Sequence, residues 1–340
     1  MRAGLLAILL AFATAQAAAP GAAPGRVVGV AGIGRMVSDL DASVRFYEAI
    51  GFVRDPGVDP AWHSDAALDR LLGIRGARGR EARMFLPSSA SGQPFALTLR
   101  ELAGIRRRNL AGYVAWEPGA SHFGMVVPDA AATWAQLRAA GLLRPRSWGG
   151  ELIALPGRTQ GVLAYMTDPD GLDIELIDQH VASPPRPAGI HHIGLIVLDS
   201  DKARSFYGEL LGGRLQAGDA PWMRGDFTDS VVGGHGNVLR FYNEAFPEAN
   251  AAAASLNFEL VEFQNRKKPV ERYGIADIAV GYLELQVEDL DALLARARAA
   301  GARLVTRGGA VMLADGRRAV LLRDPDVGGF VELFERPEPR

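Results

Sequence analysis

The sequence predicts an α+β fold built from two tandem repeats, each containing two copies of one supersecondary unit. The first observation behind this prediction is a fixed offset: the spacing from Asp39 to Asp199, and from Asp129 to Asp289, is 160 residues in both cases. The second observation is the order of patterns inside each copy. A short alternating strand leads to an Asp suited to cap a helix, about ten amphipathic residues follow, and further strands separated by turns complete the copy. We therefore expect four βαβββ units, called modules one to four, because internal repeats at a fixed period indicate repeated structural units.

Module two shows how each element is predicted. Residues 122–127 alternate like a strand, Asp129 is placed to cap a helix over 130–140, and Gly141 is placed to end that helix. Modules two and four then carry an Asp-Pro-Asp turn, written Asp168-Pro169-Asp170-Gly171 in module two, before a final apolar strand with one Glu.

Composition excludes several classes of function. The chain has 340 residues, 48% of them hydrophobic, and 37 Lys+Arg against 39 Asp+Glu give a net charge of −2. No overall positive field exists for nucleic acid, so we expect no nucleic-acid partner. The chain has no cysteine, which excludes disulfides, thiolate metal sites and thiol nucleophiles. Any metal must be bound by His, Asp or Glu.

The chain ends and the proline-rich junction predict the domain boundaries. A basic residue, a short apolar run and small-x-small sites at the start are typical of a secretory signal peptide, and the run is too short to span a bilayer. We expect a secreted or periplasmic protein without membrane association once the signal is removed. The predicted segments are a signal peptide (1–17), a flexible N-terminal segment (18–26), a first domain (27–180), a Pro-rich linker (181–188) and a second domain (189–336).

The motifs of the repeats resemble a known superfamily. Residues 191–207 read His-His-Ile-Gly-Leu-Ile-Val, then Asp199, then Phe206-Tyr207, and residues 168–176 read Asp-Pro-Asp-Gly followed by Ile-Glu-Leu. These strings resemble the vicinal oxygen chelate superfamily, which includes glyoxalase I, methylmalonyl-CoA epimerase, extradiol dioxygenases and bleomycin-resistance proteins. The resemblance implies that modules pair, that their mixed sheets curl into two cups, and that one metal lies inside a cup. Each module would contribute one residue from its first strand and one from its last.

The resemblance assigns candidate ligands position by position. If module two pairs with module three, one cup contains a complete ligand set and the other, from modules one and four, is degenerate. Pairing of module one with module two, and of module three with module four, would leave neither cup with a complete ligand set. We therefore favour the crossed pairing, while the alternative stays open. The predicted metal ligands are His122, Glu175, His192 and Glu259. The corresponding positions of the degenerate cup are Gly32, Thr98, Tyr282 and Glu332.

Several details of the predicted site stay open. Glu262 lies three residues after Glu259, so a shift in strand register would exchange which of them faces the cup. Strand alternation predicts that His191 points away from the cup. In the degenerate cup, Glu332 is either a relic or the partner of an arginine such as Arg323, and its role is open.

The ligand set allows three functions. Two neutral imidazoles and two carboxylates suit one divalent ion (Ni, Zn, Co, Mn or Fe(II)) with open positions for a small oxygen-chelating substrate. The favoured function is a metal-dependent lyase or isomerase resembling glyoxalase I or the epimerase, in which Glu259 or Glu175 moves a proton through an enediolate. The alternatives are an Fe(II) extradiol-type dioxygenase and a metal-free small-molecule binding protein. Since four modules complete two cups, a monomer suffices, and a homodimer is the other possibility.

Overall fold

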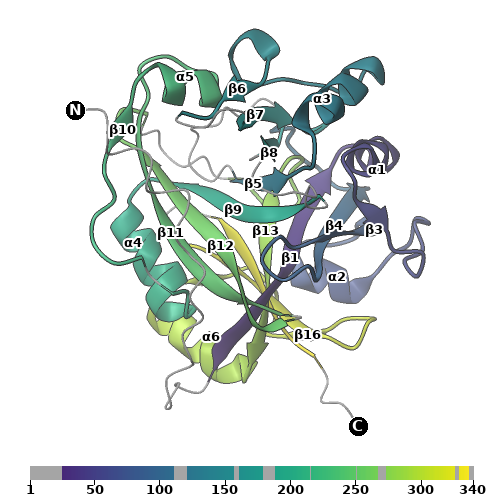
Figure 1. Ribbon diagram of the computed structural model, residues 1–340. Coiled ribbons are helices and arrows are strands. Elements are labelled where there is room, and N and C mark those ends of the chain that lie inside the picture. Colours follow the sequence, from purple (N-terminus) through teal and green to yellow (C-terminus); the bar gives the residue numbers. More distant parts are fainter. Residues whose placement is uncertain are drawn as a thin grey trace.

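The computed structural model consists of strands from four modules around which short helices pack (Figure 1). The structure describes residues 25–110, 121–156, 161–178, 188–214, 216–249, 251–266, 273–325 and 329–336. The predicted signal peptide, most of the N-terminal segment and all of the linker except Ala188 lie outside the described residues. No helix in these described ranges is long and apolar enough to cross a membrane.

The first two modules each follow the predicted βαβββ order. Module one contains β1 (Arg26–Val37), α1 (Leu40–Ala49), β2 (Val53–Arg54), α2 (Ala66–Leu71), β3 (Arg78–Pro87) and β4 (Pro94–Ala103). Module two contains β5 (Ser121–Val126), α3 (Ala130–Ala139), a 3-10 turn (Trp148–Gly150), β6 (Ile153–Ala154), β7 (Val162–Thr167) and β8 (Asp173–Asp178).

The last two modules repeat this order. Module three contains β9 (Gly189–Val197), α4 (Ser200–Arg204) with a π-helical continuation (Ser205–Leu210), β10 (Met223–Arg224), α5 (Asp226–Val232), β11 (Val238–Glu248) and β12 (Ala251–Phe263). Module four contains β13 (Gly281–Glu288), α6 (Leu290–Ala299), β14 (Arg303–Leu304), β15 (Val311–Met312), β16 (Arg318–Arg323) and β17 (Phe330–Glu335). The predicted α+β fold with four βαβββ modules is confirmed.

The modules pair in the crossed arrangement. Strand β5 of module two pairs antiparallel with β9 of module three, and β1 of module one pairs antiparallel with β13 of module four. The two resulting sheets join at two places: Val30 pairs with Glu248, between β1 and β11, and Ser88 pairs with Ile190 of β9. We call the sheet of modules two and three the first cup and that of modules one and four the second cup. Modules one and two therefore do not share a cup, and neither do modules three and four.

In all four modules, two carboxylates accept hydrogen bonds from the first turn of the helix. One of them lies on the last strand of the module, so it fixes the helix against that strand. The predicted Asp caps are present, since Asp129, for example, accepts a hydrogen bond of 2.8 Å from the backbone N–H of Ala132. A second carboxylate near the end of the last strand accepts from the first helical N–H, where the helix dipole favours negative charge. The pairs are Glu101 with Leu40, Asp178 with Ala130, Glu262 with Ser200 and Glu335 with Leu290.

Each cup contains its own cluster of buried hydrophobic residues. Leu163, Val261 and Phe263 belong to the cluster inside the first cup, whereas Met36 and Phe334 belong to the cluster inside the second. The largest cluster lies on the other side of the strands, where the helices pack. Burial of these apolar faces on both sides stabilises the curled sheets.

Candidate metal centre

Four strands of the first cup position the predicted ligands. His122 lies on β5 and His192 on β9, and the two strands are hydrogen-bonded neighbours. Glu175 is on β8, in register with Gly124, and Glu259 is on β12, in register with Gly194. The crossed pairing therefore brings together all four side chains, which come from two modules on either side of the linker.

Two glycines make room for the imidazoles. A Cβ on Gly194 would lie 2.0 Å from Cε1 of His122, and a Cβ on Gly124 would lie 2.2 Å from Cε1 of His192. Each ring thus lies directly over the backbone of the neighbouring strand, where only a glycine leaves enough space. This contact fixes the orientation of both rings across the β5–β9 ladder.

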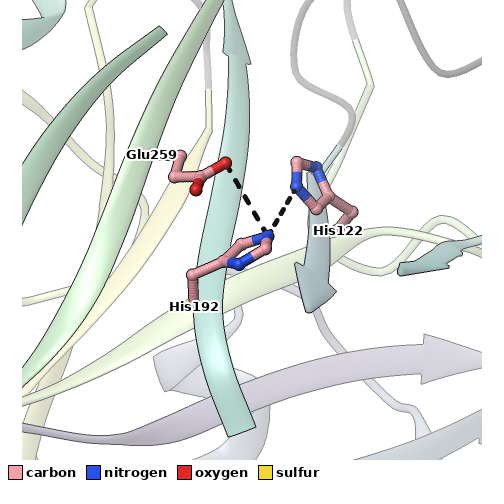
Figure 2. A group of neighbouring side chains, drawn as sticks. All are labelled: His122, His192 and Glu259. Carbon is pink, nitrogen blue, oxygen red and sulfur yellow. Dashed lines mark hydrogen bonds and ion pairs between the residues drawn. The ribbon is translucent and has the colours of Figure 1, made fainter. Parts of the chain in front are cut away.

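The ligand atoms converge on Nε2 of His192. This nitrogen lies 3.2 Å from Nε2 of His122, 3.1 Å from a carboxylate oxygen of Glu175 and 3.7 Å from one of Glu259. Figure 2 shows His122, His192 and Glu259 pointing toward one another from three strands. One ligand atom from each of these three residues lies within 4.8 Å of the other two. Glu175 lies nearer to His192 than Glu259 does, but it is not part of this compact group.

Burial and charge shift the pKa values of the four groups in different directions. Burial lowers the pKa of His122 to about 3, assisted by the neighbouring charge of His192. Burial also lowers the pKa of His192, but Glu259 and Glu175 outweigh it and raise that pKa to about 9. Burial raises the pKa of Glu259, whereas for Glu175 the hydrogen bond and charge of His192 overcome burial and lower the pKa. The site is therefore a set of strongly coupled groups in a protected environment.

These residues fit a divalent metal ion. Their carboxylates are about one-seventh exposed, and the cationic partner of both among the described residues is His192. Buried carboxylates without further positive charge are costly unless a cation neutralises them. Imidazole nitrogens and carboxylate oxygens are the donors that first-row divalent metals prefer. A metal would thus neutralise the negative charge of the two carboxylates that His192 leaves uncompensated among the described side chains.

The structure corrects the prediction for His191. A β-bulge between β5 and β9 makes His191 an extra residue, since Gly124 pairs with His192 while Met125 pairs with Ile190. Its Nδ1 lies 3.0 Å from Nδ1 of His192, so the ring contacts the site instead of pointing away. Burial lowers the pKa of His191 to about 4. Strand alternation could not show this, because a bulge interrupts the two-residue period without a fixed sequence signal.

The structure also distinguishes Glu259 from Glu262. The Glu262 carboxylate accepts hydrogen bonds from the Ser200 hydroxyl at 2.8 Å and from Arg240 at 2.9 Å, on the side of α4. It is the module-three member of the repeated helix-binding carboxylates. Glu259 lies three residues earlier on β12, on the opposite face of the sheet, and therefore points into the cup.

The second cup brings the degenerate positions together but builds a different site. The Tyr282 ring lies over Gly34, where a Cβ would be 1.8 Å from Cζ of the ring, so tyrosine takes the place of an imidazole. Arg100, from β4, donates to the Tyr282 hydroxyl and lies 3.7 Å from a carboxylate oxygen of Glu332. Thr98 is buried on β4, in register with Gly34. Gly32 is in register with Glu284 on β13, which adds a carboxylate that the sequence analysis did not select.

The partner of Glu332 differs from the one considered in the sequence. Glu332 lies within 3.4 Å of Arg317 and near Arg100, and not against Arg323, which donates to the Tyr273 carbonyl. Burial and Glu284 raise the pKa of Glu332 to about 7, against the lowering effect of the two arginines. Both carboxylate oxygens of Glu284 are buried without a hydrogen-bond partner among the described residues. Arginines thus supply in this cup the positive charge that a metal would supply in the first.

Comparison with known proteins agrees with this architecture. The family model of the Glyoxalase/Bleomycin resistance protein/Dioxygenase superfamily matches residues 29–176 and again 189–328. The chain belongs to this superfamily. The two matches correspond to two tandem domains of the family, each containing two modules.

Solved structures with the same fold include glyoxalase I variants from Zea mays. One of them aligns with a TM-score of 0.53 and 16% identity over 92% of both chains. A Bacillus subtilis protein described as a candidate dioxygenase aligns with a TM-score of 0.50 and 13% identity, covering 92% of this chain and 86% of that one. At such identities the likeness establishes the fold alone. No curated protein matches the sequence.

Proposed function

We propose that the chain is a divalent-metal enzyme that transfers a proton between adjacent carbons of a small oxygen-chelating substrate, as a lyase or isomerase of glyoxalase type. The observation that carries the proposal is the convergence of two imidazoles and two carboxylates on Nε2 of His192. Since a fold in this superfamily does not specify a reaction, the argument rests on this site.

The residues have separable roles in this proposal. A divalent metal bound by His122, His192 and Glu259, with Glu175 as the fourth ligand, would polarise adjacent substrate oxygens and acidify the neighbouring C–H bond. The two glycines hold the imidazoles in place across the ladder. Burial raises the pKa of Glu259, which makes it the stronger base of the two carboxylates. Glu175, whose pKa is lowered by His192, suits a ligand that stays ionised.

A second candidate, an Fe(II) dioxygenase of extradiol type, follows from the compact group of His122, His192 and Glu259. Two imidazoles and one carboxylate are the ligand set of many non-haem iron oxygenases, and they leave three positions open. This function requires Glu175 to stay outside the coordination sphere, which agrees with its absence from the compact group of three residues.

Metal identity tests both candidates. The protein is purified without a His tag, and its metal content is measured by mass spectrometry. Stoichiometric Ni, Co or Zn supports proton transfer, whereas oxygen-sensitive Fe(II) supports oxygenation. Absence of any stoichiometric metal, also after incubation with these ions, contradicts both and supports a metal-free binding protein.

Two further proposals concern location and assembly. We propose export through the signal peptide, on the support of residues 1–17 alone. Mass determination of the mature protein from the source cells tests it, because cleavage after Ala15 or Ala17 is expected and an intact Met1 contradicts export.

We also propose that a monomer suffices, since one chain completes both cups; light scattering distinguishes it from a homodimer.

A further inference from the structure

A pocket of about 490 Å³ lies beside the second cup, away from the metal ligands. Its walls come from the residues after α2, the segment after β4 and the residues before β13. The residue after β14, the end of β16 and the start of β17 complete the lining. Apolar residues, including Ile105, Ile275 and Phe330, line much of it. A volume of this size matches pockets that bind small organic molecules.

The charged residues of the pocket are mainly arginines. Arg75, Arg106 and Arg323 line it from three separate segments, and Asp277 is the acidic residue among its lining side chains. Arg75 and Arg106 are exposed, and neither has a hydrogen bond or ion pair within the part of the chain that the structure describes. This positive lining contrasts with the net charge of −2 for the whole chain.

The carboxylate of Asp277 does not neutralise these arginines. It accepts hydrogen bonds from the backbone N–H and Nε of Arg108, at 2.8 and 3.0 Å, and from the backbone N–H of Gly274 at 2.9 Å. Asp277 therefore shapes the turn that precedes β13 and is occupied by Arg108. The positive potential of Arg75 and Arg106 remains available to a ligand.

The walls of the pocket are fixed by bonds between modules one and four. The Thr306 hydroxyl donates to the Leu71 carbonyl at 2.9 Å, and the backbone N–H of Arg307 donates to the Arg70 carbonyl at 3.0 Å. On the opposite wall, Arg107 donates to the Ala276 carbonyl at 2.7 Å. The pocket is therefore preformed, which reduces the ordering cost of binding.

The first cup has a salt bridge at the corresponding strand position. Register places Asp173 opposite His122 and Phe330 opposite Tyr282, so Asp173 and Phe330 occupy corresponding positions. In the first cup Asp173 is paired with Arg146, which also donates to the Gly171 carbonyl at 3.2 Å. In the second cup the corresponding residue, Phe330, is uncharged, and the pocket beside it is lined by Arg75 and Arg106 from loops and by Arg323 at the end of β16.

We infer that this pocket binds a small molecule that carries an anionic oxygen group and an apolar body. Arg75 and Arg106 hold the carboxylate or phosphate, because guanidinium groups bind both through charge-assisted hydrogen bonds. The apolar body packs against Ile105 and Phe330. Since none of the pocket residues is a predicted metal ligand, binding here is independent of the metal centre.

Calorimetric titration of the full chain with three probes tests this inference. The probes are benzoate, phenyl phosphate and the neutral analogue benzamide, each titrated into chelator-treated and into metal-loaded protein. We expect one or both anions to bind equally well to the two forms and benzamide to bind at least about tenfold more weakly. The stronger anion identifies the preferred oxygen group. Anion binding only to metal-loaded protein would place the ligand at the metal centre and overturn the inference.

Matched variants locate the binding. The double variant Arg75→Gln, Arg106→Gln is expected to weaken anion binding at least about tenfold, whereas Arg45→Gln, an exposed arginine of α1 outside the pocket, is expected to leave it unchanged. Ile105→Trp keeps all charges but fills the pocket, and it is expected to abolish binding. An unchanged affinity in the double variant, or an equal loss in Arg45→Gln, would overturn the inference. Circular dichroism confirms that each variant is folded.

Discussion

The two cups share a scaffold and differ in how they neutralise buried carboxylates. Both close with the same kind of contact: Ser147 donates to the Val231 carbonyl at 2.7 Å in the first cup, as Thr306 does to Leu71 in the second. The first cup places two imidazoles beside its carboxylates, and the second places Tyr282 and Arg100 there. The difference shows that a module pair keeps its fold whether these positions carry two imidazoles or a tyrosine and an arginine.

The largest expected effect concerns Arg100, which is buried and paired with Glu81 at 2.5 Å and Glu332 at 3.7 Å. Arg100→Met removes the buried partner of Glu81 and one of the two arginines near Glu332, so we expect a loss of about 3–5 kcal/mol in the free energy of unfolding. Metal content should stay unchanged, because the first cup does not contain Arg100. Urea denaturation with parallel metal analysis measures both, and loss of metal without loss of stability would contradict the assignment.

Matched glycine variants sharpen the comparison. In Gly194→Ala the new Cβ meets His122, and we expect metal affinity to fall at least about tenfold because the ring must move. In Gly34→Ala the Cβ meets Tyr282, and we expect a stability loss of about 1–3 kcal/mol with metal affinity unchanged. Competition with a chelating dye measures the affinities. Equal metal affinity in both variants would show that His122 is not held as described.

The pH dependence of stability tests the second cup. The pKa of Glu332 is raised from its ordinary value of 4.5 to about 7 in the folded protein. The protonated form is thus favoured by folding, and the stabilisation is full below pH 4.5 and is lost as pH rises through 7. Between these pH values, Glu332→Gln should reduce the change in the free energy of unfolding by roughly 1–3 kcal/mol relative to the native chain. Chemical denaturation at several pH values measures this change, and an equal change in the variant and the native chain would contradict the assignment.

The smallest effect compares helices of the two cups. Asp129 caps α3 of the first cup through Ala132, and Asp39 caps α1 of the second through Ala42. Changing either to Ala should cost about 1 kcal/mol, since each removes one capping hydrogen bond. Thermal denaturation should show similar decreases. A much larger loss for Asp129→Ala would indicate that α3 supports the metal centre more than its geometry suggests.

The sequence predicted features that depend on local patterns and repeats. The Asp caps and the βαβββ order follow from short motifs whose spacing survives duplication, whereas the four first-cup positions came from the resemblance to the superfamily. The bulge at His191 was not predictable, because it changes register without a sequence signal. The network of Arg100 with Tyr282 and Glu332 was also missed, since these residues are distant in sequence and meet only through the crossed pairing.

Metal stoichiometry in matched double variants tests the central claim most directly. The account predicts one divalent ion per chain in the native protein and in Tyr282→Phe, Glu332→Gln, which changes the second cup. It predicts loss of that ion in His122→Ala, His192→Ala, which removes both imidazoles of the first cup. Two ions per chain, or full retention of metal in the first-cup variant, would contradict the assignment of the metal centre.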